Sequence, residues 1–275
     1  MTTTPTRAWT PDDPTPRGLW QLLGGPRHVT LVGAGGKTTL AHALADEAAA
    51  SGAAVLLTTT THMQREPGLF TDPDEALRWL QHEESPLKAP EVANSTPFGP
   101  LSTLSSSWGA VRGRVVVAGR LTNGKFTAPA EVDLDRLRRA ADVVVVEGDG
   151  SRRLPFKVPA AHEPVVPAWT DLLVVVAGAS ALGHPLGEVC HRPPEASALL
   201  GEPDAAARLL DPPLAARLLR TGYLDNPALA PWADRRAVVL NQADDEHLDH
   251  LGRELATLLP GETVILTSNH RPADH

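Results

Sequence analysis

The sequence is poor in cysteine and in long apolar runs, and each shortage excludes a class of protein. Its 275 residues include one cysteine, Cys190, which rules out an intrachain disulfide and any zinc or iron–sulfur site made only of cysteines. No apolar run approaches the ~20 residues of a membrane helix, and residues 1–16 lack the apolar core of a signal peptide. We therefore expect a cytoplasmic protein with no membrane partner.

Positive charge is also in short supply. The formal net charge is −8 at pH 7, which argues against a surface that tracks nucleic acid. Hydrophobic residues make up 42% of the chain, enough for a globular core. The composition favours a small-molecule or protein partner and excludes a nucleic-acid partner.

The most informative stretch, residues 27–40, is itself marked by a missing glycine. A run typical of a β-strand over residues 29–32 ends in a glycine-rich turn, and Lys37 and Thr38 then begin an amphipathic segment. Backbone amides, a helix dipole and an ammonium thus converge on one point, as phosphate binding requires. The P-loop pattern G-x-x-x-x-G-K-[ST] would place its first glycine at Leu31, so this loop is a shortened form.

This loop predicts a nucleotide site. The expected cofactors are a nucleoside triphosphate, ATP or GTP, and Mg²⁺, with the Thr38 hydroxyl as a metal ligand and Lys37 on the phosphates. An ordinary glycine-rich turn between a strand and a helix is the alternative. The residues expected to hold the nucleotide here are Gly33, Ala34, Gly35, Gly36, Lys37, Thr38 and Thr39.

A second buried strand is predicted over residues 143–146, which are four consecutive valines, and Glu147 and Asp149 follow it. A carboxylate at the carboxyl end of such a strand binds Mg²⁺ directly or through water. We expect at least one of these two acids to lie at the metal with Thr38. The alternatives are a simple turn at Asp149 and a structural ion pair at Glu147.

Three cations come directly after these acids: Arg152, Arg153 and Lys157. Any of them could stabilise phosphoryl charge in the manner of an arginine finger, and exposure on the surface is the alternative for each. The catalytic candidates are therefore Lys37, Glu147, Asp149, Arg152 and Lys157.

Two further polar groups follow predicted strands. Threonines fill residues 58–61, after an apolar run over residues 53–57, and we expect them to face the same crevice as Lys37, unless they only extend the strand. Asn241 and Asp244 follow the strand predicted over residues 236–240. P-loop GTPases carry Asn-Lys-x-Asp at this place to hold guanine, but here Gln242 replaces the lysine. Asn241 and Asp244 are therefore candidates for binding the nucleotide, and the sequence does not specify which base they would contact. Capping of the next helix is the alternative for Asp244.

The predicted fold is α/β: one three-layer, P-loop NTPase-like domain with a mainly parallel sheet over residues 17–267. We expect a disordered tail over residues 1–16, which are rich in threonine and proline, and a second tail over residues 268–275. The dipeptide Asn123-Gly124 predicts an inserted β-hairpin over residues 113–128, and residues 194–222 predict a helical cap. Residues 85–107 predict a long surface loop.

With these segments assembled, the chain resembles the selenium-dependent hydroxylase accessory protein family, the YqeC-like proteins. The run Glu147-Gly-Asp-Gly-Ser-Arg, Lys157 and His162-Glu-Pro are the most specific part of the likeness, although alanine is commoner at Gly148 in that pattern. The resemblance implies a P-loop nucleotide-binding protein that helps to mature molybdenum hydroxylases, including those with a labile selenium. The matching segments are residues 32–40, 55–63, 147–167, 178–193 and 241–244.

The expected function is thus a Mg²⁺-dependent, nucleotide-hydrolysing accessory protein, with a molybdenum hydroxylase or its maturation machinery as partner. One alternative is a small-molecule kinase or acyl-phosphate ligase, because the shortened loop looks like those of Mur-type ligases. Another is a nucleotide-gated binding protein without turnover. A metal or selenium site is not expected, because the spacing of the candidate ligands matches no metal pattern: His62, Met63, His162, Cys190 and His191.

Overall fold

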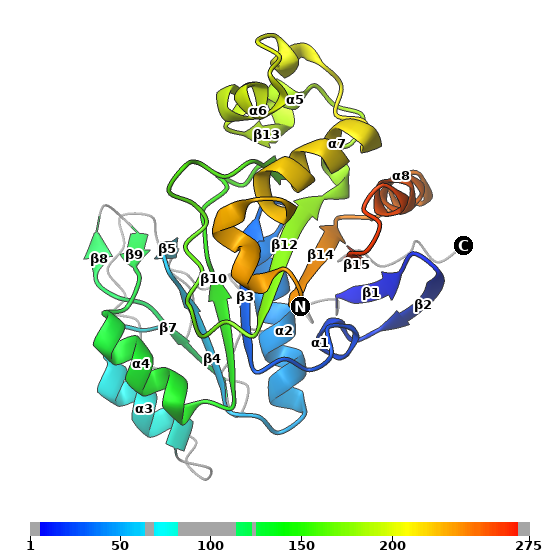
Figure 1. Cartoon of the computed structure of the whole chain (residues 1–275). Coiled ribbons are helices and arrows are strands. Elements are labelled where there is room, and N and C mark those ends of the chain that lie inside the picture. The colour runs from blue at the N-terminus through cyan, green and yellow to red at the C-terminus, as the bar shows by residue number, and fades with distance from the viewer. Residues whose placement is uncertain (1–5, 64–68, 82–113, 123–124, 269–275) are drawn as a thin grey trace, which may run out of the picture.

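The computed structural model describes residues 6–63, 69–81, 114–122 and 125–268 (Figure 1). Its centre is a ten-stranded sheet. In spatial order the strands are β2 (Asp13–Arg17), β1 (Arg7–Thr10), β15 (Thr263–Ser268), β14 (Arg236–Asn241), β12 (Leu172–Gly178), β3 (His28–Gly33), β10 (Val143–Glu147), β4 (Val55–Thr59), β7 (Arg114–Val117) and β6 (Leu69–Phe70). From β15 to β6 all neighbours are parallel, and β1 and β2 are antiparallel, so the predicted α/β class with a mainly parallel sheet is confirmed.

Two small sheets and a set of helices complete the described chain. One small sheet pairs β11 (Phe156–Lys157) with β13 (Cys190–His191), and the other joins β5 (His62–Met63), β9 (Lys125–Thr127) and β8 (Leu121–Thr122). The helices are α1 (Leu19–Leu22), α2 (Lys37–Ala50), α3 (Pro73–Gln81), α4 (Glu131–Ala140), α5 (Leu186–Val189), α6 (Pro193–Leu200), α7 (Pro212–Leu219) and α8 (Glu246–Thr257). Short turns are η2 (Ala179–Ala181), η3 (Ala205–Ala207), η4 (Arg220–Leu224) and η5 (Pro227–Trp232). No helix in these ranges is long and apolar enough to cross a bilayer.

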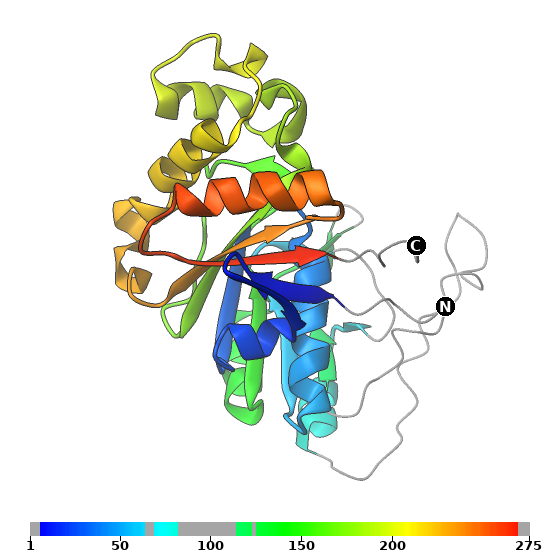
Figure 2. The ribbon, with the colours of Figure 1, turned by 90° about the vertical axis from the view of Figure 1, so that its right-hand side faces the viewer.

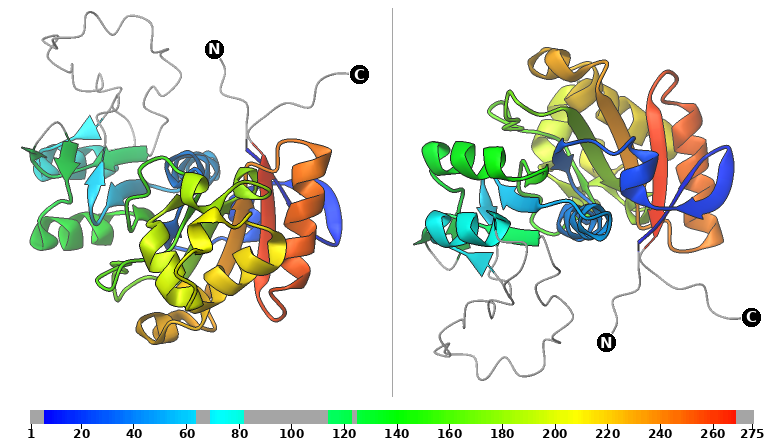
Figure 3. Two further views of the ribbon diagram at one scale, coloured as in Figure 1. Left: turned by 90° about the horizontal axis from the view of Figure 1, so that it is seen from above. Right: turned by 90° about the horizontal axis from the view of Figure 1, so that it is seen from below.

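The apolar strands are buried on both faces, and successive side chains pack against different layers. On β10, Val143 and Val145 belong to the cluster formed with α2, whereas Val144 and Val146 belong to the cluster formed with α3 and α4. The view from above places α2 and α7 on opposite sides of the sheet (Figure 3). Helices therefore cover both faces, in three layers.

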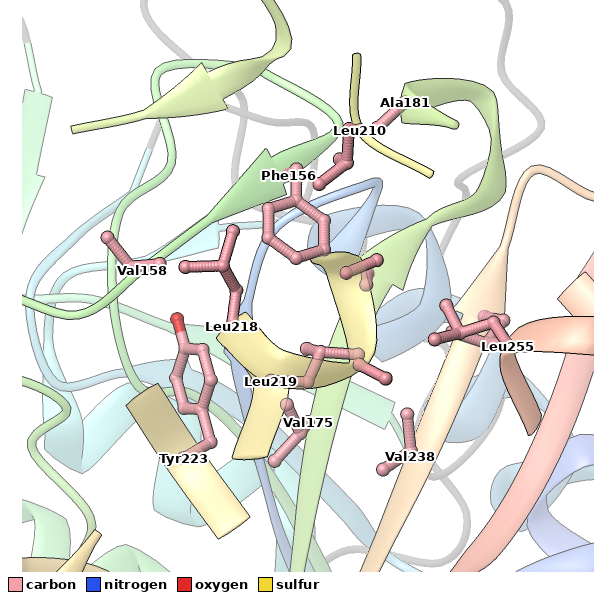
Figure 4. Packing of buried hydrophobic residues seen from close by; sticks show 14 of the residues in the cluster. Phe156, Val158, Val175, Ala181, Leu210, Leu218, Leu219, Tyr223, Val238 and Leu255 are labelled. Atoms are coloured by element: carbon pink, nitrogen blue, oxygen red, sulfur yellow. The ribbon is translucent and has the colours of Figure 1, made fainter. Parts of the chain in front are cut away.

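The region predicted as one helical cap over residues 194–222 has two parts. Leu219 of α7 lies close to Val175 and Val238 of the sheet, and Leu218 points toward Val158; all belong to one buried cluster, so this helix belongs to the core (Figure 4). In contrast, α6 stands beyond α7, away from the sheet, beside α5 and β13, which come before the predicted region (Figure 1). Of the predicted helical cap, α7 is corrected to a core helix, because its apolar face is buried on the sheet.

The predicted disordered tail over residues 1–16 is also corrected, because the described part contains β1 and most of β2. Figure 2 shows these two strands, in dark blue, beside β15, in red. The side chain of Ala8 is fully buried, and the Trp9 indole N–H donates to Asp249 Oδ1 at 2.9 Å. Pro14 and Pro16 lie on the outermost strand, where a missing N–H removes no bond from the interior of the sheet.

The predicted hairpin over residues 113–128 is shorter than expected. Arg114–Val117 is a strand of the large sheet, parallel to β4, because its valines are buried on both faces. The antiparallel pair is β8 with β9, and β9 also pairs with β5. Residues 123–124, the loop predicted over 85–107 and residues 269–275 of the predicted second tail lie outside the described residues.

Candidate functional site

The site is built at the carboxyl end of β3, where residues 33–39, here called the glycine loop, lead into α2. Gly33 and Gly35 have φ of 97° and 85°. A Cβ on Gly33 would lie 2.2 Å from the Val176 carbonyl oxygen, and one on Gly35 would lie 2.2 Å from the Gly178 nitrogen. Glycine is thus required both for its conformation and for the close approach to β12.

The first turn of α2 presents unpaired backbone donors. The first helical amide with a backbone acceptor is that of Leu40, which donates to the Gly36 carbonyl at 3.0 Å. For the amides of Lys37, Thr38 and Thr39, the described part of the chain supplies no acceptor, as is usual for a first turn. The positive end of the helix dipole is therefore directed out of the glycine loop.

Lys37 is folded back onto its own loop. Only 2% of the residue is exposed, and its Nζ donates to the Gly33 carbonyl at 2.6 Å. The same Nζ lies 3.2 Å from Asp149 Oδ1 and 3.9 Å from Glu147 Oε1. The structure thus brings the predicted lysine and both predicted acids together.

Glu147 lies at the end of β10, next to the start of α2. Its Oε2 accepts a hydrogen bond from the Thr38 hydroxyl at 2.9 Å, and 18% of its side chain is exposed. Burial raises the pKa of the Glu147 carboxyl, and the charge of Lys37 and the hydrogen bond from Thr38 oppose that rise. This carboxylate can reach both the glycine loop and solvent.

Asp149, only two residues later, is in a different environment. The residue is fully buried, and both carboxylate oxygens accept from the Gly33 amide, at 3.1 and 3.2 Å. Oδ2 also accepts from Lys157 Nζ at 2.7 Å, while Oδ1 faces Lys37. Asp149 therefore holds the glycine loop from inside the protein.

Lys157, on β11, is fully occupied by acceptors. Its Nζ lies 2.7 Å from Asp149 Oδ2, 2.7 Å from the Gly150 carbonyl and 2.7 Å from Glu163 Oε2. An ammonium has three N–H donors, so none is left for another acceptor. Glu163 in turn pairs with Arg192, whose Nη2 donates to Oε1 at 2.9 Å.

Burial alone would raise the pKa of Glu163, but the hydrogen bonds from Arg192 and Lys157 outweigh it and lower that pKa to about 2. Glu163 and Arg192 were not predicted as site residues. The sequence signal for Glu163 was its place in the His162-Glu-Pro run, and its partner 29 residues later could not be read from the sequence. We call the connected side chains the ion-pair row: Lys37, Asp149, Lys157, Glu163 and Arg192.

The two other predicted cations, Arg152 and Arg153, have exposed side chains and lie in the loop after Asp149. Both have positive φ, 50° and 64°, which is unusual for a residue with a Cβ. The structure does not draw either of them into the ion-pair row.

Asn241 joins the end of β14 to the glycine loop. Its Nδ2 donates to the Gly35 carbonyl at 2.6 Å, and its Oδ1 accepts from the Thr267 hydroxyl at 2.8 Å. Asp244 Oδ1 accepts from the Ser268 hydroxyl at 2.6 Å. The helix cap predicted as an alternative for Asp244 is wrong, because Asp245 caps α8 through the Leu248 amide at 2.8 Å.

The threonine tract lies against the acidic end of β10. The Thr59 hydroxyl donates to the Glu147 carbonyl at 3.0 Å, and the Thr60 hydroxyl donates to the Gly148 carbonyl at 3.2 Å. These bonds fix the backbone that carries Glu147. Within the described ranges, no group of three or more His, Cys, Asp and Glu side chains is arranged to hold a metal ion.

Comparison with known proteins identifies a family. The family model described as "YqeC protein" matches residues 29–194. A curated protein from Escherichia coli (strain K12), described as uncharacterized protein YqeC, is 34% identical over 166 residues, which are 59% of this chain and 54% of that protein. The chain thus spans about half the length of this relative, and no solved structure gives a significant match. Because the family model covers more than half of its residues, the chain belongs to the YqeC protein family.

Proposed function

We propose that the protein binds a nucleoside triphosphate with Mg²⁺ at the glycine loop and hydrolyses it, as an accessory protein in the maturation of a molybdenum- or selenium-dependent hydroxylase. The observation that carries the nucleotide site is the contact between α2 and β10. Thr38 Oγ1 and Glu147 Oε2 are 2.9 Å apart, directly beside Lys37. This places a hydroxyl, a carboxylate and an ammonium at one helix N-terminus.

The Thr38 and Glu147 oxygens fit Mg²⁺. Two neighbouring ligands of an octahedral Mg²⁺, each at ~2.0–2.1 Å, stand about 2.9 Å apart, and the two oxygens already have that separation. The metal, when bound, would neutralise charge on the phosphate oxygens. Asp149 suits this role less well, because both of its oxygens are enclosed by the Gly33 amide and by lysines.

The backbone of the glycine loop supplies the phosphate ligands. The amides of Lys37, Thr38 and Thr39 are available at the N-terminus of α2, and Asn241 holds the loop through the Gly35 carbonyl. Asp244 and Ser268, at the ends of β14 and β15, would border the base. ATP and GTP both remain candidates.

The topology supports the same location. After β3 the chain adds strands on one side of it, up to β10, and then crosses to the other side to form β12, β14 and β15. In parallel sheets, ligands bind beyond the carboxyl ends of the strands where the order changes direction. The glycine loop lies at that point. The accessory role rests on the family resemblance, since the site itself carries no group specific to selenium or molybdenum.

The direct test is calorimetry with ATP and with GTP, in the presence and absence of Mg²⁺. We expect micromolar binding of at least one of them, stronger with Mg²⁺. Lys37→Ala should weaken it by at least about tenfold, because a lysine on the phosphates is lost. The fold should survive this change, since Lys157 still pairs with Asp149. Glu147→Gln should remove the effect of Mg²⁺ while leaving metal-free binding.

The matched control is Lys125→Ala, which removes an exposed lysine on β9. Absence of triphosphate binding by the wild type, or equal loss in the control, would refute the nucleotide site. Phosphate release measured on the same samples separates the candidate functions. Binding without release would favour a nucleotide-gated binding protein, and a phosphorylated small molecule in mass spectra would favour a kinase or ligase.

A further inference from the structure

Lys37 and Lys157 share one carboxylate, that of Asp149. Lys37 Nζ lies 3.2 Å from Oδ1, and Lys157 Nζ lies 2.7 Å from Oδ2. Lys37 can bind a phosphate only by giving up contacts around the loop, of which the closest charged one is to Asp149, since Glu147 Oε1 lies farther away, at 3.9 Å. The release of Lys37 therefore depends on what else neutralises Asp149.

We propose that Lys157 is a positioning residue for the nucleotide site. It keeps the buried Asp149 neutralised when Lys37 turns to the triphosphate, and so raises the affinity of a ligand that it does not touch. The inference rests on the proposed function, and it assigns Asp149 as the shared counter-ion of two lysines. The sequence alone suggested that Lys157 stabilises phosphoryl charge as a catalytic residue. In this proposal it does not have that role.

The geometry separates Lys157 from direct contact with a ligand. Its side chain is fully enclosed, and its three donors are all used, by Asp149, Gly150 and Glu163. Lys37, in contrast, makes one short hydrogen bond, to the carbonyl of its own loop. Lys37 can turn outward because Asp149 then keeps Lys157 as its cation and Glu147 keeps its hydrogen bond from Thr38.

The energetic argument concerns Asp149 after Lys37 has left. An ionised carboxylate that is fully buried and loses its cation is strongly destabilised, whereas one that keeps a cation is not. Lys157 provides that second cation. Glu163 holds Lys157 in place, and Arg192 binds the same Glu163 carboxylate. Lys157 therefore stays in contact with Asp149. The row thus keeps its charges paired in both positions of Lys37.

A double-mutant cycle tests this inference, with the dissociation constants of ATP and GTP measured with Mg²⁺ by calorimetry. In Lys157→Met, Lys37 is the cation left to Asp149, so triphosphate binding should weaken by about tenfold or more. In Asp149→Asn, the carboxylate nearest to Lys37 is neutral and Glu147 remains at 3.9 Å, so Lys37 is held back less and binding should be equal to or tighter than that of the wild type. In the double variant the carboxylate that needs Lys157 is gone. Binding should therefore return to within about threefold of Asp149→Asn.

Each outcome decides between defined alternatives. If Lys157 contacted phosphate or only supported the fold, its loss would weaken binding equally in the Asp149→Asn background, and the inference would be overturned. Weaker binding by Asp149→Asn alone would also overturn it, and would favour Asp149 as a metal ligand. If Lys157→Met alone does not fold by circular dichroism, the comparison of the double variant with Asp149→Asn still decides, because Lys157 should have no effect on affinity once the carboxylate is gone.

The two proposals fail in distinguishable ways. A wild type that binds no triphosphate refutes the proposed function and with it this inference. A wild type that binds, together with a Lys157→Met variant of equal affinity, leaves the proposed function intact and refutes only the role of Lys157. Lys125→Ala again serves as the control for loss of a lysine away from the site.

Discussion

At the scale of single residues, Cys190 is a nearly inert thiol. The residue is 1% exposed, and burial raises its pKa to about 12. The thiolate is the reactive form of cysteine, and at pH 8 a thiol with so high a pKa is protonated. We predict that iodoacetamide at pH 8 leaves the native protein unmodified over an hour and labels it fully in denaturant, as read by intact mass.

Rapid labelling of the native protein would contradict this account of Cys190. Cys190→Ala, which carries no thiol, is the control for reaction at other side chains.

The two acids after the valine strand, Glu147 and Asp149, show which properties of a site residue can be predicted from the sequence. Strand, glycine loop, Lys37, Thr38 and the acids were predicted in the right elements, because each pattern is local. The different environments of Glu147 and Asp149 were not predicted. They depend on Lys157, which approaches Asp149 from β11, and on a helix start that approaches Glu147 from α2. Such a difference arises only from tertiary packing.

At the scale of elements, the N-terminal strand gives a prediction. β1 pairs with β15 through Arg7, Ala8 and Trp9, and thereby covers the edge of the parallel sheet. Deletion of residues 1–17 should lower the melting temperature by about 5–10 °C, because pairing, the buried Ala8 and the Trp9 bond to Asp249 are lost. It should also promote aggregation, because an open edge strand can pair with another chain. Thermal unfolding and light scattering measure the two effects.

The control for that deletion is Thr15→Ala, which changes an exposed side chain on the outer strand and should leave the melting temperature unchanged. A truncated protein with the same melting temperature as the wild type would contradict this prediction and support the expectation of an unstructured tail. The error in that expectation has a physical source. Strand propensity is a weak guide for four residues at an edge, where pairing with a partner strand outweighs local preference.

The contrast between local and long-range interactions also explains which other elements could be predicted from the sequence. Long apolar runs such as residues 143–146 and 236–240 were readable as strands, because strands buried on both faces need no polar alternation. Arg114–Val117 was assigned to a hairpin because the nearby Asn-Gly signal is a local one, whereas its true partner, β4, is far away in sequence. The sequence of α7, which begins with two prolines, showed an apolar face but not what that face covers.

At the scale of the whole molecule, strand order was beyond the sequence. β10 lies between β3 and β4, and β12 lies on the other side of β3. That order is what brings Glu147 beside Thr38 and Asn241 beside Gly35. The candidate site is therefore a product of topology as much as of motif.

The ion-pair row also joins distant parts of the fold, and this makes overall stability depend on pH. Glu163 connects β11, through Lys157, with the start of α6, through Arg192. The pKa of Glu163 is lowered to about 2 from an ordinary value of 4.5. A lowered carboxyl pKa stabilises the fold fully above the unfolded-state value, and that contribution disappears as the pH falls toward the folded-state value.

We therefore predict that Glu163→Gln lowers the free energy of unfolding at pH 7 by roughly 1–3 kcal/mol, and that the difference from the wild type shrinks between about pH 4.5 and pH 2. Urea unfolding of both proteins across this range measures it. Taking the difference cancels the titration of carboxylates common to both proteins. Glu188→Gln, an exposed carboxylate on α5, should show no such pH-dependent difference. A constant difference down to pH 2 would mean that Glu163 stabilises the fold through shape and not through its charge, and that the row is not the electrostatic link between the glycine loop and α6.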